Sequence, residues 1–318
     1  MKSLMKGLLS GLTLLGLSAA PALAEYPEKP IEIIVGYSAG GGTDVLARTV
    51  GGYLEKALGG EASVVVKNMP GAGGQIGFTA VAQAKPDGYT LGTFNLPAAL
   101  ALTLDREADY DADSFTYLAN FVKDPNTIVV SKETGIESLK DLLDRAAKEP
   151  GRVTMGLSAL GGNDHFAGIL MESAAGVDVS FVPFKGAANA RAAIMGGHVM
   201  AGTMTLGQTV GYEDNLRVLA VLDSERSPFA PDVPTAKELG YDVEMGSYRG
   251  LVAPAGLPEA VREKLLTALR AVNDNPEFQK TMVEQGNPAS FVAGDDFAAL
   301  AGKQASVAAK IWNATPWK

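Results

Sequence analysis

The stretch Ile31-Glu32-Ile33-Ile34-Val35-Gly36-Tyr37-Ser38-Ala39-Gly40-Gly41-Gly42-Thr43-Asp44 decides how this sequence folds. An apolar run typical of a buried strand leads into a triple glycine, and an amphipathic pattern typical of a helix follows. Glycines let the backbone turn sharply and leave its N–H groups uncovered, and a helix start adds unpaired donors and a partial positive charge. The stretch therefore predicts a strand, a loop and a helix start that together can bind an anion.

The same plan recurs twice along the chain. A strand over 63–67 precedes a glycine-rich loop over 68–77, and a strand over 152–157 precedes a loop over 158–162. Because the first two units are consecutive, we expect a parallel sheet with both loops at its carboxyl end, where open α/β sheets bind ligands. The third unit predicts a second α/β lobe. Between these units, apolar runs over 117–122 and 127–130 are broken by Asp124-Pro125.

The first 24 residues have the features of a secretory signal peptide. Lys2 and Lys6 precede an apolar core over 8–17, and Ala22-Leu23-Ala24 fits a cleavage site. We therefore expect a mature, exported chain that begins at Glu25, and its length suits one large domain or two lobes. No later segment is long and apolar enough to predict a membrane span.

Composition argues against several classes of function. The chain has no cysteine, two histidines and a formal net charge of −9. It can form neither a disulfide nor a thiolate metal site, and a histidine-rich metal site is excluded by count. An acidic surface disfavours nucleic acid and anionic lipid. We expect no metal, no cofactor and no nucleic-acid partner, and an exported protein without disulfides fits the bacterial periplasm.

Nucleotide-binding motifs are not matched. A P-loop needs Lys followed by Ser or Thr after its last glycine, and this chain has Thr43-Asp44 there. The dinucleotide pattern fails at Ile76, and Asn68 stands where an acidic residue would hold the ribose. A nucleotide-dependent α/β enzyme is therefore the weaker alternative.

A hydrolase would use Ser158 or Ser38 with Asp164 and His165. Adjacent residues on one helix cannot face each other as a catalytic triad requires, and G-x-S-x-G is absent from the sequence. Asp164 is then either a helix cap or a ligand contact, and His165 is either a partly buried structural donor or a ligand contact. We expect no catalysis.

Binding without chemistry is the remaining interpretation. Three glycine loops over two lobes suit a molecule with two or more carboxylates, whose charge the backbone dipoles can hold with few Lys or Arg. Arg249 is the cation to consider, because it interrupts the apolar run Tyr248-Arg249-Gly250-Leu251-Val252. It is either an inward-facing ligand contact or a solvated surface residue.

Ordered sequence blocks over nearly all of the mature chain resemble the extracytoplasmic solute receptors of tripartite tricarboxylate transporters, the Bug family. The blocks are Tyr26-Pro27-Glu28-Lys29-Pro30, Gly40-Gly41-Gly42-Thr43-Asp44 with Ala47-Arg48, Asn68-Met69-Pro70-Gly71-Ala72-Gly73-Gly74, Pro86-Asp87-Gly88-Tyr89-Thr90-Leu91, Val182-Pro183-Phe184-Lys185-Gly186, Gly196-Gly197-His198-Val199, Arg226-Ser227-Pro228 and Ala253-Pro254-Ala255-Gly256.

The resemblance implies an α/β periplasmic binding protein of the type II-like, Venus flytrap kind, with a mostly parallel sheet in each lobe. We expect the first lobe to comprise 25–122 and 248–318, the second lobe to comprise 123–247, and the ligand cleft to lie between them. Family receptors capture a carboxylate and deliver it to a membrane permease with a large and a small subunit. The resemblance implies the same partners here, with a monomeric receptor, and presentation of the ligand to a sensor kinase stays open as an alternative.

The resemblance also places the ligand. The first two loops would hold one carboxylate and the third loop the distal end, with closure of the lobes on a ligand that touches both. The implied ligand-binding residues are Tyr37, Ser38, Gly40, Gly41, Gly42, Thr43, Asp44, Gly73, Gly74, Asn95, Ser158, Gly162, Asn163, Asp164, His165, Thr205 and Arg249.

Two features bear on ligand choice. Gly36-Tyr37-Ser38-Ala39 replaces the family's usual Pro-Phe-x-Pro, which adds hydroxyls at the expected cleft wall. Asn163-Asp164-His165 together with Tyr248-Arg249-Gly250 is more similar to the tricarboxylate-receptor branch than to receptors for amino acids or aromatic acids. The resemblance therefore favours a citrate-like or C4-dicarboxylate ligand.

Overall fold

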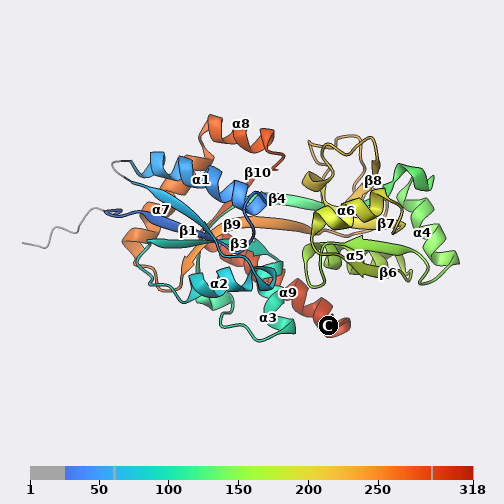
Figure 1. Cartoon of the computed structure of the whole chain (residues 1–318), viewed down its shortest axis with the longest axis horizontal. Helices are drawn as coiled ribbons and strands as arrows, with labels where there is room; N and C mark the ends of the chain where they lie inside the picture. Colours follow the sequence, from blue (N-terminus) through green and yellow to red (C-terminus); the bar gives the residue numbers. More distant parts are fainter. Residues whose placement is uncertain (1–25, 60–61, 288, 318) are drawn as a thin grey trace, which may run out of the picture.

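The computed structural model describes residues 26–59, 62–287 and 289–317. The chain forms two α/β lobes that lie side by side along the long axis of the molecule (Figure 1). The signal peptide predicted over 1–24 lies outside the described residues. Within those ranges every helix is too short or too polar to cross a lipid bilayer.

The first lobe contains the predicted strand, loop and helix units. Its strands are β1 (Ile31–Val35), β2 (Val64–Asn68), β3 (Thr90–Leu96), β9 (Gly246–Pro254), β10 (Ala289–Ala293) and the first part of β4 (Phe115–Ser131). Its helices are α1 (Gly42–Leu58), α2 (Gln75–Ala82), α3 (Ala98–Asp105), α7 (Glu259–Asn273), α8 (Pro276–Glu284) and the beginning of α9 (Asp295–Ala314). Strand β1 pairs in parallel with both β2 and β3, so the loops after β1 and β2 share one end of the sheet, as predicted.

The second lobe repeats the plan around a shorter set of strands. These are the second part of β4, β5 (Thr154–Leu157), β6 (Ser180–Pro183), β7 (Ala201–Thr205) and β8 (Leu216–Val221). Helices α4 (Leu139–Lys148), α5 (Asn163–Ala175) and α6 (Ala187–Met195) pack against them. Strand β5 pairs in parallel with β6 and β7, and α5 follows β5 after the third glycine loop.

Strand β4 connects the two lobes. The runs over 117–122 and 127–130 are not separate elements, because one strand continues through Pro125. Proline removes one ladder donor, and the ladder resumes at Asn126, whose N–H donates to the Met245 carbonyl at 2.8 Å. Gly246 is required opposite this point, because a Cβ there would lie 2.9 Å from the Asp124 carbonyl oxygen.

The strands of the described chain order as β2-β1-β3-β9-β4-β7-β5-β6, with β8 and β10 also pairing with β4. Strands β4 and β9 run side by side between the lobes in opposite directions (Figure 1). Because they are antiparallel to each other and to their other neighbours, each lobe has a mixed sheet. This corrects the expectation of mostly parallel sheets, which holds for β1–β3 and β5–β7.

Helix α9 makes a further link between the lobes. Phe297 and Ala301 pack in the first lobe with Phe94 and Tyr117, whereas Ile311 and the following Trp317 pack in the hydrophobic core of the second lobe. The assignment of all of 248–318 to the first lobe stays a prediction, and the end of that segment contacts the second lobe.

Candidate ligand-binding site between the lobes

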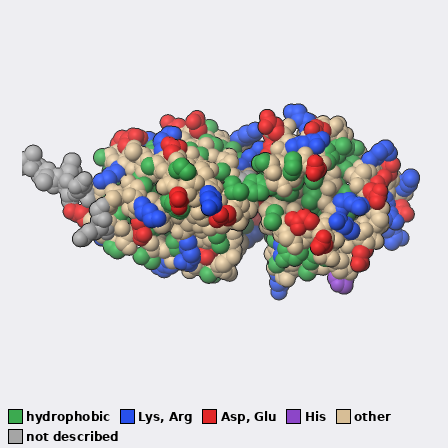
Figure 2. Space-filling view, turned by 90° about the horizontal axis from the view of Figure 1, so that it is seen from above, with side chains coloured by type: hydrophobic (Ala, Val, Ile, Leu, Met, Phe, Trp, Pro, Cys, Tyr) green, Lys and Arg blue, Asp and Glu red, His purple; other side chains and the backbone are tan. Residues whose placement is uncertain are grey.

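A furrow separates the two lobes in the space-filling view (Figure 2). The predicted site residues come from both lobes and approach one another where β4 crosses between them. The first lobe brings the start of α1 and the ends of β3 and β9 to this place. The second lobe brings the start of α5 and the end of β7.

The start of α1 is an open anion site. Gly40, Gly41 and Gly42 are exposed, and the helix has Gly41 at its N-cap without a side-chain cap. Val45 donates its N–H to the Gly41 carbonyl, whereas the N–H groups of Gly42, Thr43 and Asp44 form no hydrogen bond with the described residues. Unpaired donors at the positive end of a helix favour a bound anion.

Asp44 holds this loop in shape. Its buried carboxylate accepts hydrogen bonds from the Gly40 N–H at 2.8 Å, from Arg48 Nη2 at 2.9 Å and from Asn68 Nδ2 at 2.8 Å. These bonds, above all those from Arg48, lower the pKa of Asp44 to about 2. The carboxylate is therefore committed to the loop, and a direct ligand contact by Asp44 stays a prediction that its bonding does not favour.

The second glycine loop supports the first one from behind. Gly74 has a φ of 106°, and a Cβ there would lie 2.9 Å from the Phe78 ring and 3.1 Å from Tyr37 Cζ. A Cβ on Gly36 would lie 2.8 Å from the Gly74 carbonyl oxygen. Glycine is needed here for close packing of two loops. Gly73 is exposed, and the Tyr37 ring packs edge-on against Phe78.

Arg249 faces inward beside the first loop. Its side chain is 11 % exposed, and Nη2 donates to Asp124 Oδ2 at 2.9 Å while Nη1 donates to Asn287 Oδ1 at 3.1 Å. A Cβ on Gly42 would lie 3.3 Å from Nη1, so the guanidinium borders the start of α1. Asn95, opposite Arg249 in the β3–β9 ladder, donates Nδ2 to Thr43 Oγ1 at 2.8 Å. The surface alternative for Arg249 is thus wrong.

The third loop is held by Asp164, as the first is by Asp44. Asp164 follows the N-cap Gly162 and Asn163 and caps no helix end with its side chain, which corrects that alternative. Its buried carboxylate accepts from Asn126 Nδ2 at 2.8 Å, from Asn163 Nδ2 at 2.9 Å and from the Ser158 hydroxyl. Burial raises the pKa of Asp164, against the lowering effect of these donors.

His165 lies behind the third loop. Its Nδ1 accepts a hydrogen bond from the Gly161 N–H at 3.2 Å, so in this contact His165 is a structural acceptor and not the structural donor of the first alternative. The residue is 5 % exposed, and its ring packs edge-on against Phe181 and Trp317. Burial lowers the pKa of His165 to about 4, which keeps the imidazole neutral at neutral pH. A ligand contact by His165 stays a prediction.

Several residues of the site were missed from the sequence. These residues are Asp124, Asn126, Gly207 and Asn287. Asp124 joins the two halves, because the Gly207 N–H donates to Asp124 Oδ1 at 3.0 Å while Arg249 binds the other carboxylate oxygen. Asn126 donates to Asp164, and Asn287 accepts from Arg249. One signal was available. Polar side chains at 124 and 126 interrupt an otherwise apolar run, and a buried polar residue is the informative exception in such a run.

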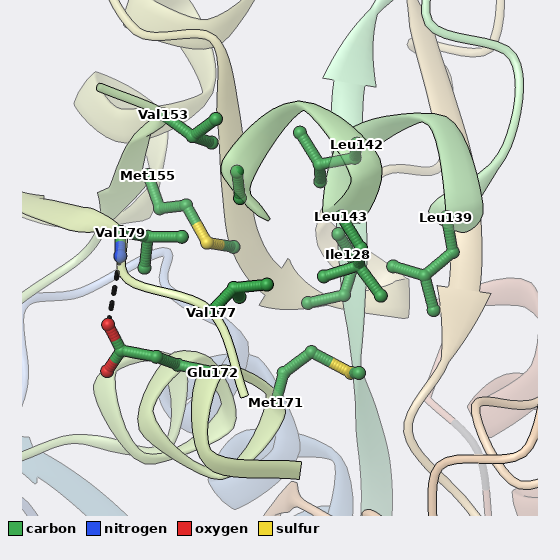
Figure 3. A pocket seen from close by; sticks show the side chains of 11 residues that line it. Ile128, Leu139, Leu142, Leu143, Val153, Met155, Met171, Glu172, Val177 and Val179 are labelled. Atoms are coloured by element: carbon green, nitrogen blue, oxygen red, sulfur yellow. Dashed lines mark hydrogen bonds between the residues drawn. The ribbon is translucent and has the colours of Figure 1, made fainter. Parts of the chain in front are cut away.

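A void in the second lobe is not part of this site. Side chains from α4, β4, β5 and α5 point into it (Figure 3). Its lining is apolar except for Glu172, whose carboxylate accepts a hydrogen bond from the Val179 N–H at 2.9 Å. The cavity volume of about 10 Å³ is at the lower limit for one water molecule. We interpret it as a packing gap.

Comparison with known proteins agrees with this architecture. The family model described as "Tripartite tricarboxylate transporter family receptor" matches residues 46–314. The protein BugT of Bordetella pertussis is 36% identical over 245 residues, which cover 75% of this chain and 74% of BugT.

Two solved structures from Rhodopseudomonas palustris are also similar. MatC with bound malate is 27% identical, with a TM-score of 0.76 over 90% of this chain and 99% of that one. A second protein, solved with adipate, is 27% identical, with a TM-score of 0.80 over 91% of this chain and 97% of that one.

Two α/β lobes joined by crossing strands, with open helix starts beside the furrow, define a two-lobed periplasmic binding protein fold. Within that class, the chain belongs to the receptor family of tripartite tricarboxylate transporters.

The ion pair between Arg249 and Asp124 yields a first prediction. Arg249→Met leaves the Asp124 carboxylate, whose side chain is 3 % exposed, without its cation. Loss of one partner of a buried ion pair costs about 3–5 kcal/mol. We expect a decrease of that order in the free energy of unfolding, measured by urea denaturation. The double variant with Asp124→Asn should recover part of it, and no recovery would contradict the pairing.

His165 yields a second prediction. Because its pKa of about 4 lies below the ordinary 6.5, the unfolded chain binds the proton first as the pH falls. The neutral imidazole therefore contributes to the free energy of unfolding above about pH 6.5, and this contribution is lost as the pH falls toward 4. Its upper limit is about 3 kcal/mol. His165→Gln should therefore flatten the pH dependence of the free energy of unfolding between about pH 7 and 4.5.

The other histidine supplies the matched control. His198 is exposed, so His198→Gln should keep the pH dependence of the unsubstituted protein. Urea denaturation followed by circular dichroism at both pH values measures the change. Equal slopes for the unsubstituted protein and His165→Gln would show that burial of this imidazole is not linked to folding.

Proposed function

We propose that this protein is a periplasmic receptor that captures a di- or tricarboxylate between its lobes. The observation that carries the proposal is the open start of α1, where three N–H groups without a partner among the described residues lie beside the largely buried Arg249 guanidinium. Backbone donors at a helix N-terminus hold an anion without a large positive surface. An acidic protein can therefore bind an acidic ligand at this place.

The second lobe supplies the other half of the proposed site. The start of α5 also lacks a side-chain cap, and Ser158 and Asn163 are held beside it through Asp164. A carboxylate on the first loop would leave the distal end of the ligand near these groups. A ligand that touches both lobes stabilises the closed arrangement over the open one. The malate and adipate bound by the two similar R. palustris proteins each carry two carboxylates.

The proposed role is capture and delivery, without catalysis. Membership of the receptor family supports a tripartite permease with a large and a small membrane subunit as the acceptor of the ligand. Export through the signal peptide predicted over 1–24 would bring the receptor to the periplasm. The citrate-like or C4-dicarboxylate preference implied by Asn163-Asp164-His165 is part of the same proposal.

Calorimetric titration of the mature protein with a panel of organic acids tests this function. We expect at least one di- or tricarboxylate to bind with a 1:1 ratio, and monocarboxylates of similar size to bind more weakly. ATP and NAD serve as negative ligands, and neither should raise the melting temperature. Failure of every organic acid to bind would contradict the proposed function, and stabilisation by a nucleotide would favour an enzyme.

Substitution of Gly41 tests the location of the site. Gly41 has a φ of −77°, and a Cβ there meets no atom closer than 3.5 Å, so Gly41→Val is compatible with the fold. The added side chain would cover the donors at the start of α1. We expect at least a 100-fold loss of affinity for the acid that binds best, measured by calorimetry, with a melting temperature close to that of the unsubstituted protein.

Gly52 in the same helix is the matched control. A Cβ at Gly52 meets no described atom within 4 Å, and the residue lies more than two turns from the first loop. Gly52→Val should therefore leave the affinity unchanged. Unchanged affinity in Gly41→Val as well would show that the first loop does not hold the ligand.

A further inference from the structure

Two buried side chains of the candidate site have a polar atom without a partner. Asn95 is 8 % exposed and Thr205 is 1 % exposed, and neither Asn95 Oδ1 nor Thr205 Oγ1 forms a hydrogen bond with the described residues. Asn95 lies near the end of β3 in the first lobe, and Thr205 lies at the end of β7 in the second lobe. Each lobe thus brings one unsatisfied group toward the site.

Such groups carry an energetic penalty. A buried donor or acceptor without a partner costs about 1–3 kcal/mol, and most buried polar groups in proteins are paired. A ligand that supplies the missing partner recovers this penalty and gains selectivity over an analogue that lacks it. The chemistry of the unpaired atom therefore indicates what the ligand has to offer.

The unpartnered atom of Asn95 is a hydrogen-bond acceptor, so it needs a donor from the ligand. Its Nδ2 is already used on Thr43 Oγ1 at 2.8 Å, so the free atom is the amide oxygen, which can only accept. A carboxylate has no proton to donate, whereas a hydroxyl group has one. Thr43 belongs to the first turn of α1, so this acceptor lies next to the place where the open N–H groups favour a carboxylate.

A hydroxyl fits better than an ammonium group. Arg249 lies opposite Asn95 in the β3–β9 ladder, and its guanidinium offers a ligand only N–H donors. On the first-lobe side of the site the carboxylates are already paired, Asp44 with Arg48 and Asp124 with Arg249. A ligand ammonium beside Asn95 would therefore meet further N–H donors and no free carboxylate among these residues.

We propose that the bound acid is a hydroxy acid, with a hydroxyl group next to the carboxylate at the start of α1, and that Asn95 Oδ1 accepts the hydrogen bond from this hydroxyl. Thr205 Oγ1, which can both donate and accept, contacts the opposite end of the ligand. This proposal rests on the proposed carboxylate receptor and names the class of acid. Asn95 is thereby a specificity-determining residue.

Calorimetry on the unsubstituted mature protein with matched acid pairs tests the inference. Each pair differs by one hydroxyl group: malate against succinate, and citrate against propane-1,2,3-tricarboxylate. We expect the hydroxy acid to bind at least 10-fold more tightly in the pair that fits the site, and aspartate to bind more weakly than malate.

Asn95→Ala locates the selectivity. Removal of the amide should reduce the preference for the hydroxy acid to less than about threefold, mainly through weaker binding of the hydroxy acid. Asn120→Ala is the matched control, because Asn120 Oδ1 is also buried without a partner, but its Nδ2 donates to Val122 and Ser290 carbonyls in the first lobe. That variant should keep the preference.

The outcomes separate this inference from the function on which it rests. Equal or tighter binding of the acid without hydroxyl in both pairs overturns the hydroxy-acid proposal and leaves a carboxylate receptor. Tighter binding of aspartate than malate overturns it in favour of an amino acid. An unchanged preference in Asn95→Ala removes Asn95 from the mechanism. If no acid binds at all, the proposed function fails together with the inference. The comparisons on the unsubstituted protein decide the ligand class even if Asn95→Ala does not fold.

Discussion

The first and the third glycine loops of this protein each depend on one buried carboxylate. A loop such as Ser38–Gly42 has almost no side chains that could fix its shape, and glycine has the largest backbone entropy to lose on folding. Asp44 accepts the Gly40 N–H in the first lobe, and Asp164 accepts from Ser158 in the second. Both aspartates lie in the first turn of the helix that follows the loop, where a negative charge is favourable. The loop is held from inside, and its outer N–H groups stay open.

The two carboxylates are compensated differently. Arg48 and Asn68 surround Asp44, and the ion pair lowers its pKa to about 2. Around Asp164 the described contacts are neutral donors from Asn126, Asn163 and Ser158, and burial raises its pKa. As the pH falls, Asp164 in the third loop should therefore be protonated before Asp44 in the first loop. The amide network also makes the position of Asp164 depend on β4, the strand that both lobes share.

Local sequence patterns predict the strand, loop and helix units, but they do not predict how strands from distant parts of the chain pair to connect the lobes. The strand, loop and helix plan is visible around residues 31–58 and 152–175 because its period and its glycines are encoded in consecutive residues. Strand β7 is hard to predict because its sequence Ala-Gly-Thr-Met-Thr has no run of apolar β-branched residues, and Gly202 leaves space for Ile194, which would clash with a Cβ there. Pro125 read as a break, although Gly246 lets the strand continue beside it.

In the candidate site, too, contacts between residues far apart in the sequence could not be predicted. Its loops and Arg249 were evident from the sequence, whereas the partner of Arg249 lies 125 positions away and is brought to it by the β4–β9 ladder. That pairing changes the role of the arginine. Since Asp124 compensates its charge, Arg249 adds directed N–H donors beside α1 more than net positive charge. Attraction for an anion then comes mainly from backbone dipoles, which have a fixed direction and short range. The site is therefore expected to respond to where the carboxylates of a ligand lie more strongly than to how many it carries.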